Sequence, residues 1–452
     1  MGFTTDLQGT SGPGETNGRV VVIGAGLAGS EAAWQAAQAG TWVELWEMRP
    51  QVMTPAHQTG DCAELVCSNS LHSNRLESAS GLLKEELRRL DSVILAAADA
   101  HAVPAGQALA VERRVFAQDV TARLQAHPRI RMVRRERQAL WPLDAVTVVA
   151  TGPLTSPALA KDIAAFVGTD FLYFYDAAAP IVTAESIDYS RAFWGSRYQR
   201  GQADYLNCPL SEEEYRVFWQ ALVEAEQAPL EAADAEMHYF EGCLPVEVMA
   251  RRGPETLAYG PLKPVGLRDP RTGKRPYAVV QLRREDREGR LFNLVGFQTR
   301  LKWGEQERVF RMIPALANAE FVRFGVMHRN TFLNAPQVLL PTYQSRREPR
   351  LFFAGQMTGV EGYIESCASG LIAGRNAARL AQGLEPLAFP RETMLGAMAR
   401  FITEADPGNF QPMNATLALL PPLEPAVRDK RRRHQLLAER ALQALERFIR
   451  GL

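Results

Sequence analysis

Three glycines in the segment 24–29, GAGLAG, stand at the spacing G-x-G-x-x-G. At this spacing Gly24 permits a tight turn, Gly26 lets the backbone approach a pyrophosphate, and Gly29 allows a helix to pack closely on a strand. A lone match is also compatible with an ordinary turn. Here the motif follows an apolar run, opens an Ala-rich helix whose N-terminus favours phosphates, and precedes an acid at the end of the next apolar run. The predicted dinucleotide-binding residues are Gly24, Ala25, Gly26, Leu27, Ala28, Gly29 and Glu47.

Two later turns favour FAD over NAD as the dinucleotide. The first is Ala150-Thr151-Gly152 and the second is Gly355-Gln356, and in two-part flavoproteins such turns close over the cofactor from the same domain. Either turn alone would be an ordinary loop. The chain has no second complete fingerprint, so we expect any nicotinamide reductant to bind transiently. The predicted cofactor residues therefore also include Thr151, Gly152, Gly355 and Gln356.

Two of the five cysteines have surroundings that suit chemistry. Cys67 lies in the polar, turn-prone stretch AELVCSNSLHSN, where we expect an accessible thiol. Cys243 lies in HYFEGCLPVEVMARRG, close to acidic and basic side chains. A free cysteine is more often a small buried apolar residue than a nucleophile, and that interpretation is kept for Cys62, Cys208 and Cys367.

Further polar residues suit recognition of a ring or of phosphates. His328, in RFGVMHRNTFLNAP, can stack on a heteroaromatic ring, and Arg329 and Asn330 can bond the edge of that ring. A core histidine is the alternative. Basic clusters are usually solvated surface, but several on one face form a phosphate-binding patch. Four such clusters occur, at 129–137, 268–275, 283–290 and 428–434.

The elements that position these residues follow a β-α-β pattern. Residues 19–23 form a β-branched apolar run, which the Ala-rich helix and the run 41–47 follow, and the segments 146–154 and 351–381 look like returns to the same sheet. Between them the composition changes to aromatic and charged stretches with many prolines. We therefore expect an α/β fold, a glutathione-reductase-like FAD-binding Rossmann-type domain, at 19–155 and 325–452. An inserted α+β substrate domain is expected at 156–324, and a disordered tail at 1–18.

Composition limits where the chain works and what it binds. With 51 basic and 51 acidic residues among 452, the net charge is +0, so any polyanion site must be a local patch. The first 18 residues lack a basic start and an apolar core, which excludes a signal peptide. No apolar run approaches the ~20 residues of a membrane span, and the odd number of cysteines without a CxxC pair favours a reducing compartment. We expect a cytoplasmic protein without a metal site.

A set of longer motifs carries a family resemblance. The motifs are VVIGAGLAGSEAAWQ, EMRP followed by MTPAH, LVCSNSL, VPAGQALAV, ATGPLTS, ADYLNCP, CLPVE, GPLKPVGL, VVQLR, LVGFQT, GVMHRNTFLNAP and GVEGY. By these motifs the chain resembles the folate- and FAD-dependent tRNA uracil-5-methyltransferases, TrmFO, from Val20 to about Asn414. The inserted domain at 156–324 would then contact tRNA. The related GidA flavoproteins, which modify wobble uridines, are longer and carry a helical C-terminal domain for which we expect no room here.

The resemblance implies a reaction. A methylene group passes from methylenetetrahydrofolate to reduced flavin and then to C5 of a tRNA T-loop uridine, giving ribothymidine, with NAD(P)H as electron source. C5 of uracil is a poor nucleophile until a thiolate adds to C6, and a base must afterwards remove the C5 proton. We assign Cys243 to the attack and Cys67 to the base or protective role, although the two roles can be exchanged. The resemblance also places His328 near the flavin, under the folate, and the target uridine must leave its stack to arrive there.

Two other function classes remain open at this stage. One is an FAD-dependent oxidoreductase of a small molecule, with Cys67 and Cys243 structural and no affinity for RNA. The other is a flavin-stabilised RNA-binding protein whose flavin does not react with methylenetetrahydrofolate. The sequence does not reveal the oligomeric state, the choice between NADH and NADPH, or the basic cluster that contacts tRNA.

Overall fold

The structure is a computed structural model, and it describes residues 18–168, 172–177, 179–199, 202–228, 244–286, 288–325, 327–408 and 410–451. For 172–177, 199 and 327–331 only the backbone is described. The predicted tail, apart from Gly18, lies outside the described residues, and so does Cys243.

A five-stranded parallel sheet forms the centre of the first unit, with strand order β16-β7-β1-β2-β6. Its central strand β1 is the apolar run before the glycine motif, and Val20 and Val22 are fully buried in it. Strands buried on both faces are typical of parallel sheets covered by helices. The bounds are β1 Arg19–Ile23, β2 Trp42–Glu47, β6 Ile130–Arg134, β7 Val146–Val149 and β16 Leu351–Phe353.

Helices cover this sheet, and two of them pack unusually closely. A Cβ atom on Gly370 of α11 would lie 2.1 Å from the carbonyl oxygen of Ala28 in α1, and one on Gly374 would lie 2.4 Å from that of Ala32. Only glycine fits at these two positions. The helices of the first unit are α1 Leu27–Gln38, α2 Ala79–Arg88, α3 Val93–Ala100, α4 Arg113–Ala126, α5 Pro157–Val167, α10 Ala335–Val338, α11 Tyr363–Ala381, α12 Met394–Glu404 and α13 Lys430–Arg450.

The second unit is built on a six-stranded antiparallel sheet, order β10-β11-β12-β13-β9-β14. Its apolar core contains buried residues between Ala179 and Ala319. Its strands are β9 Ile181–Thr183, β10 Phe193–Gly195, β11 Tyr205–Leu210, β12 Ala278–Arg284, β13 Leu291–Leu294 and β14 Phe321–Arg323. Its helices are α6 Glu212–Glu224, α7 Val246–Arg251, α8 Thr256–Tyr259 and α9 Trp303–Phe310.

The packing differs at one place from the limits that we predicted for the insert, 156–324. Helix α5 falls in that range, but its buried residues Leu159, Ile163 and Val167 belong to the core of the first unit. An amphipathic helix can bury its apolar side against any apolar core within reach. Here that core is the one next to β7. The core of the second unit begins only after α5 and the strand that follows it.

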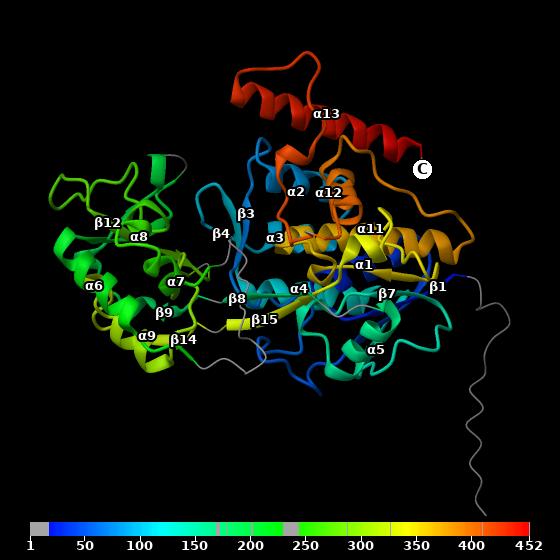
Figure 1. Cartoon of the computed structure of the whole chain (residues 1–452), viewed down its shortest axis with the longest axis horizontal. Coiled ribbons are helices and arrows are strands. Elements are labelled where there is room, and N and C mark those ends of the chain that lie inside the picture. The colour runs from blue at the N-terminus through cyan, green and yellow to red at the C-terminus, as the bar shows by residue number, and fades with distance from the viewer. Residues whose placement is uncertain are drawn as a thin grey trace, which may run out of the picture.

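Two small sheets complete the fold. Strand β8 (Leu172–Ala177) pairs antiparallel with β15 (Met327–Phe332), and Figure 1 shows this pair where the chain passes between the two units. Strand β5 (Ala108–Val111) pairs with both β3 (Ser70–Ser73) and β4 (Ala102–Val103) beside α2 and α3.

Candidate functional site

A cleft lies at the carboxyl ends of the parallel strands, where ligands bind in open α/β sheets. The segments that follow β1, β2, β6, β7 and β16 all line it. Among the predicted cofactor residues, the lining contains Gly24, Gly26, Leu27, Ala28, Glu47, Thr151, Gly152, Gly355 and Gln356. Ala25 and Gly29 lie just behind this surface. Most of the residues predicted to bind the cofactor thus line one cleft.

The three glycines of the fingerprint meet three different constraints. Gly24 has φ +95°, and a Cβ there would lie 2.6 Å from the carbonyl oxygen of Ala150. A Cβ on Gly29 would lie 1.7 Å from the carbonyl oxygen of Gly24, so the helix can follow the strand only without a side chain. At Gly26 nothing lies within 4 Å of the added Cβ, and no side chain caps α1. The first turn of α1 thus opens to the cleft with room for a pyrophosphate.

Glu47 ties the glycine loop to the next segment. One carboxylate oxygen accepts the Ala25 N–H at 2.8 Å, and the other accepts the backbone N–H of Arg49 at 3.0 Å and its Nε–H at 2.9 Å. Burial raises the pKa of Glu47, but the hydrogen bonds and charge of Arg49 outweigh it and hold the pKa below its ordinary value. A carboxylate has about four lone-pair sites. Three protein bonds leave room for one ribose hydroxyl.

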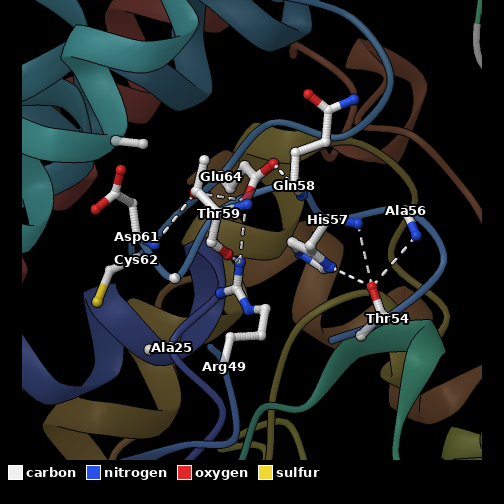
Figure 2. A network of polar contacts seen from close by, with 12 residues as sticks. Ala25, Arg49, Thr54, Ala56, His57, Gln58, Thr59, Asp61, Cys62 and Glu64 are labelled. Atoms are coloured by element: carbon white, nitrogen blue, oxygen red, sulfur yellow. Dashed lines mark hydrogen bonds and ion pairs between the residues drawn. The ribbon is translucent and has the colours of Figure 1, made fainter. Parts of the chain in front are cut away.

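A polar network folds the loop after β2 against the cleft (Figure 2). Arg49 Nη1 donates to Glu64 Oε2 at 3.2 Å, and Glu64 also accepts the N–H and hydroxyl of Thr59 at 3.0 and 2.8 Å. Thr54 Oγ1 and His57 Nδ1 are 2.6 Å apart. Four of these side chains line the cleft: Arg49, Thr54, His57 and Glu64. The sequence reasoning assigned them no role, although they lie in or near the EMRP and MTPAH motifs.

A flat aromatic surface lies at the same end of the cleft. The Arg135 and Arg137 guanidinium groups lie 5.2 and 5.4 Å from the centroid of the Trp46 ring, and all three residues line the cleft. Indole and guanidinium planes offer stacking faces to a heteroaromatic ring. This arrangement fits the adenine of a dinucleotide.

Cys67 is partly exposed beside the cleft, and cations surround it. Its backbone N–H donates to the Tyr363 hydroxyl at 2.7 Å, and its carbonyl accepts from Arg113 Nη2 at 3.1 Å. Arg323 donates to the carbonyl of the preceding residue, Val66. Tyr363 and Val66 both line the cleft. Cys67 is thus an accessible thiol, and two guanidinium groups bond the backbone carbonyls of its loop.

The other described cysteines are buried. Burial raises the pKa of Cys62 to about 11 and that of Cys208 to about 12, and the pKa of Cys367 is also raised by burial. Such thiols stay protonated near neutral pH and are inert.

The second unit grips the loop that carries Cys67. Arg113 of the first unit pairs with Glu285 of the second, with Nε to Oε2 at 2.8 Å and Nη2 to Oε1 at 3.1 Å. Burial lowers the pKa of Arg113, but Glu285 raises it above its ordinary value. From the other side, Arg283 donates to Asn69 Oδ1 at 2.9 Å and to Ser68 Oγ at 2.7 Å. The position of Cys67 therefore depends on both units.

The predicted folate residues His328, Arg329 and Asn330 lie on β15, whose backbone pairs with residues 174–176 of β8. Strand β15 lies against the 3-10 turns Gly152–Leu154 and Gln356–Thr358 of the cofactor cleft. The structure thus brings this segment to the cleft. It does not describe where the three side chains lie.

Comparisons with known proteins identify the family of this chain. Residues 19–385 match the family described as glucose inhibited division protein A, GIDA. The chain is 63% identical over 430 residues to methylenetetrahydrofolate--tRNA-(uracil-5-)-methyltransferase TrmFO of Heliobacterium modesticaldum, which covers 95% of this chain and 98% of that protein. It is 59% identical to the TrmFO of Lactiplantibacillus plantarum, covering 95% and 97% of the two chains.

Among solved structures, two crystal forms of Aquifex aeolicus GidA are similar, with TM-scores of 0.69 and 0.68. Each covers 96% of this chain, and 73% and 78% of the GidA chains are covered. At 16% and 17% sequence identity this likeness shows the fold alone. In the described part of the chain, no helix is both long and apolar enough to cross a membrane.

Proposed function

Because this chain belongs to the TrmFO group of the GidA-related family, we propose that it methylates C5 of a uridine in the tRNA T-loop. Methylenetetrahydrofolate is the carbon donor and FAD the cofactor. The observation that carries the proposal is one cleft that joins a glycine fingerprint to the acid at the end of the second strand, with the partly exposed Cys67 next to the lining residue Val66.

FAD fits the residues present. The open first turn of α1 at Gly26 suits the pyrophosphate, Glu47 keeps one acceptor site for the ribose, and Trp46 offers a face to the adenine. The turns at Thr151–Gly152 and Gly355–Gln356 close the cleft from the other strands. When bound, FAD supplies the redox chemistry and carries the one-carbon unit.

The thiols supply the chemistry on uracil. A thiolate that adds to C6 makes C5 nucleophilic, and C5 bonds the methylene carbon. A base then removes the C5 proton as the bond from that carbon to its carrier breaks. A hydride that originates from NAD(P)H turns the methylene into a methyl group as the sulfur leaves C6. We assign Cys243 to the addition and Cys67 to the base or protective role. Arg113 and Arg323 bond the backbone carbonyls of the Cys67 loop, which holds this thiol beside the cleft.

The remaining partners follow the same proposal. His328 stacks on the folate beside the flavin, with Arg329 and Asn330 at the edge of its ring. NAD(P)H binds transiently as the electron source, and the protein works on tRNA in the cytoplasm.

Trapping of the uracil adduct tests the proposal. Transfer RNA with 5-fluorouridine at the target should form a covalent complex with the wild-type protein, because fluorine does not leave as a proton does. Cys243→Ala should abolish the complex. Cys67→Ala should still form it, and on tRNA that carries the ordinary uridine it should fail to release the methylated product. The opposite pattern exchanges the two roles. Wild-type turnover of labelled methylenetetrahydrofolate carbon into tRNA by both variants would contradict the thiol mechanism.

A separate variant tests the folate assignment. His328→Ala should raise the KM for methylenetetrahydrofolate without changing the flavin content, because its ring stacks on the folate only. Unchanged folate dependence in steady-state kinetics would return this histidine to a structural role.

A further inference from the structure

The four basic clusters differ in how far the protein itself uses their charges. In three of them most arginines bond acceptors or stack on rings of this chain: Arg129, Arg131, Arg134, Arg135, Arg137, Arg268, Arg271, Arg283, Arg284 and Arg290. In the fourth, the described residues provide no side-chain hydrogen bond or ion pair to the cations Arg428, Lys430, Arg431, Arg432 and Arg433. The charges of this last cluster are therefore available to bind an anion from outside the chain.

The place of this cluster makes it costly to the free protein. Its residues 430–433 form the first turn of α13, which contains no acidic residue, and Asp429 caps the helix by accepting the Arg432 N–H at 2.7 Å. Cations at a helix N-terminus oppose the helix dipole, and adjacent cations repel each other. Local stability does not explain the cluster, whereas a bound polyanion would neutralise it.

The helix is anchored, so the cluster has a defined position. The apolar face of α13, with Leu437, Ala441 and Leu445, is buried in the core of the first unit, and Glu446 pairs with Arg89 of the α2 end at 2.5 Å. An amphipathic helix that binds a membrane needs its apolar face free. This face is already occupied, which favours a polyanion that contacts only the charged turn.

A groove runs from the cluster to the strand that leaves the Cys67 loop. Its cations are Arg75, Lys430 and Arg431, and its two carboxylates are engaged by the protein, since Glu77 pairs with Arg75 at 3.6 Å and Asp429 caps α13. Ser73, Ser78, Gln107 and His434 complete the lining. Figure 1 shows the first turn of α13 at the left end of that helix, above β3. A chain spans at most ~3.5 Å per residue, so Ser73 lies within about 21 Å of Cys67.

Buried Lys84 holds the strand between them in place. Its Nζ donates to the carbonyls of Leu71 and Ser73, both at 2.7 Å. The groove and the catalytic thiol are thus connected by a short, fixed segment of the first unit.

We propose that this groove, between β3 and the first turn of α13, is a second contact surface for tRNA that binds backbone phosphates. The inference rests on the proposed function, because a tRNA arm that presents its uridine at Cys67 brings phosphates within this reach. Contacts between cations and phosphates carry no sequence information. The groove therefore binds the phosphate backbone of the tRNA without distinguishing its bases. It explains how a chain of net charge +0 attracts a polyanion.

The test compares two variants that each lose four positive charges. The first is K430Q/R431Q/R432Q/R433Q. The control is R131Q/R290Q/R350Q/R391Q, whose arginines are at least half exposed but already paired with carboxylates. The affinity of each protein for unmodified tRNA is measured by fluorescence anisotropy across a salt series. Flavin content and thermal midpoint check the fold.

We expect the slope of log K against log salt to become shallower by at least about 1.5 in the first variant, since Lys430 and Arg431 line the groove and each lost phosphate contact removes about 0.7–0.9. The control should keep the wild-type slope, and R431K/R432K/R433K should keep it as well. An unchanged slope in the first variant, or an equal change in the control, would overturn the proposal. So would loss of phosphatidylserine-vesicle binding with tRNA affinity unchanged. Binding is measured without turnover, so a protein that binds tRNA through this groove but transfers no methyl group contradicts only the proposed function.

Discussion

Replacing Glu47 by glutamine should weaken flavin binding while leaving the sheet intact. The carboxylate accepts three N–H groups, from Ala25 on one side and from Arg49 on the other, and it is 5% exposed. A glutamine side chain has one oxygen and one N–H₂ group in place of the two carboxylate oxygens. It can therefore accept hydrogen bonds from Ala25 or from Arg49, but not from both. We expect the oxygen to stay with the Arg49 guanidinium, which leaves the Ala25 N–H without an acceptor and shifts the glycine loop.

The size of the effect follows from this lost bond. A hydrogen bond to a charged group contributes roughly 1.5–3 kcal/mol, and each 1.4 kcal/mol is tenfold in a dissociation constant. The lost hydrogen bond belongs to the glycine loop that holds the pyrophosphate, so its free energy is lost from FAD binding. The Kd for FAD should therefore rise about 10- to 100-fold. Purified Glu47→Gln should therefore contain less flavin and regain it only at higher FAD concentration.

The assay is FAD titration of deflavinated protein, followed by the quenching of flavin fluorescence. Glu44→Gln is the matched control, because Glu44 lies on the same strand and makes only long ion pairs of 3.9 Å, with Arg19 and Arg131. It should bind FAD as the wild type does. Equal Kd values for Glu47→Gln and the wild type would refute the role given to this carboxylate.

The same carboxylate also predicts a dependence on pH. The folded-state pKa of Glu47 is lowered from its ordinary value of 4.5. Its contribution to stability is therefore fully present above pH 4.5 and is lost as the pH falls from 4.5 through the lower folded value. Urea unfolding midpoints between pH 3 and pH 6 should fall less steeply for Glu47→Gln than for the wild type.

Three further changes test the packing and the buried charges. Gly370→Ala should lower the free energy of unfolding by about 1–3 kcal/mol or more, because its Cβ would lie 2.1 Å from the backbone of α1. The control Gly304→Ala, which has open space around its Cβ, should be neutral or slightly stabilising in thermal unfolding. Glu285→Gln should cost about 3 kcal/mol in urea unfolding, because it leaves the buried Arg113 guanidinium without its carboxylate; a cost below 1 kcal/mol would contradict the pairing. Burial raises the pKa of Glu86 to about 8, so the free energy of unfolding should fall as the pH rises from 4.5 to 8, and Glu86→Gln should flatten that slope; parallel pH profiles would show that this carboxyl is not perturbed.

The dinucleotide cleft could be predicted from sequence because its determinants are local. The tight turn at Gly24, the open position at Gly26 and the acid at Glu47 all lie within one β-α-β unit, where short connections force neighbours in sequence to be neighbours in space. The later turns at residues 151–152 and 355–356 could be placed because their strands return to the same parallel sheet.

Other features could not be derived because they arise from contacts between distant segments. The sequence predicted that Cys67 would be accessible, but not that Arg113 from α4 and Arg323 from β14 would flank its loop. The network of Arg49, Thr54, His57 and Glu64 was also missed, because a polar loop shows no periodicity that would indicate which side chains turn inward.

By itself, the sequence determined the fold class, the fingerprint and the family, since these depend on local periodicity, on glycines at fixed spacing and on motifs along most of the chain. It did not determine which of four basic clusters is free, nor that α5 packs on the first unit. Those outcomes depend on which acceptor or apolar surface folding brings within a few ångströms of each side chain. Arg283 donates to Asn69, 214 residues away, whereas the side chain of Arg431 has no partner among the described residues. Only the tertiary structure decides between two such arginines, because a guanidinium is neutralised by its neighbours in space and not by those in sequence.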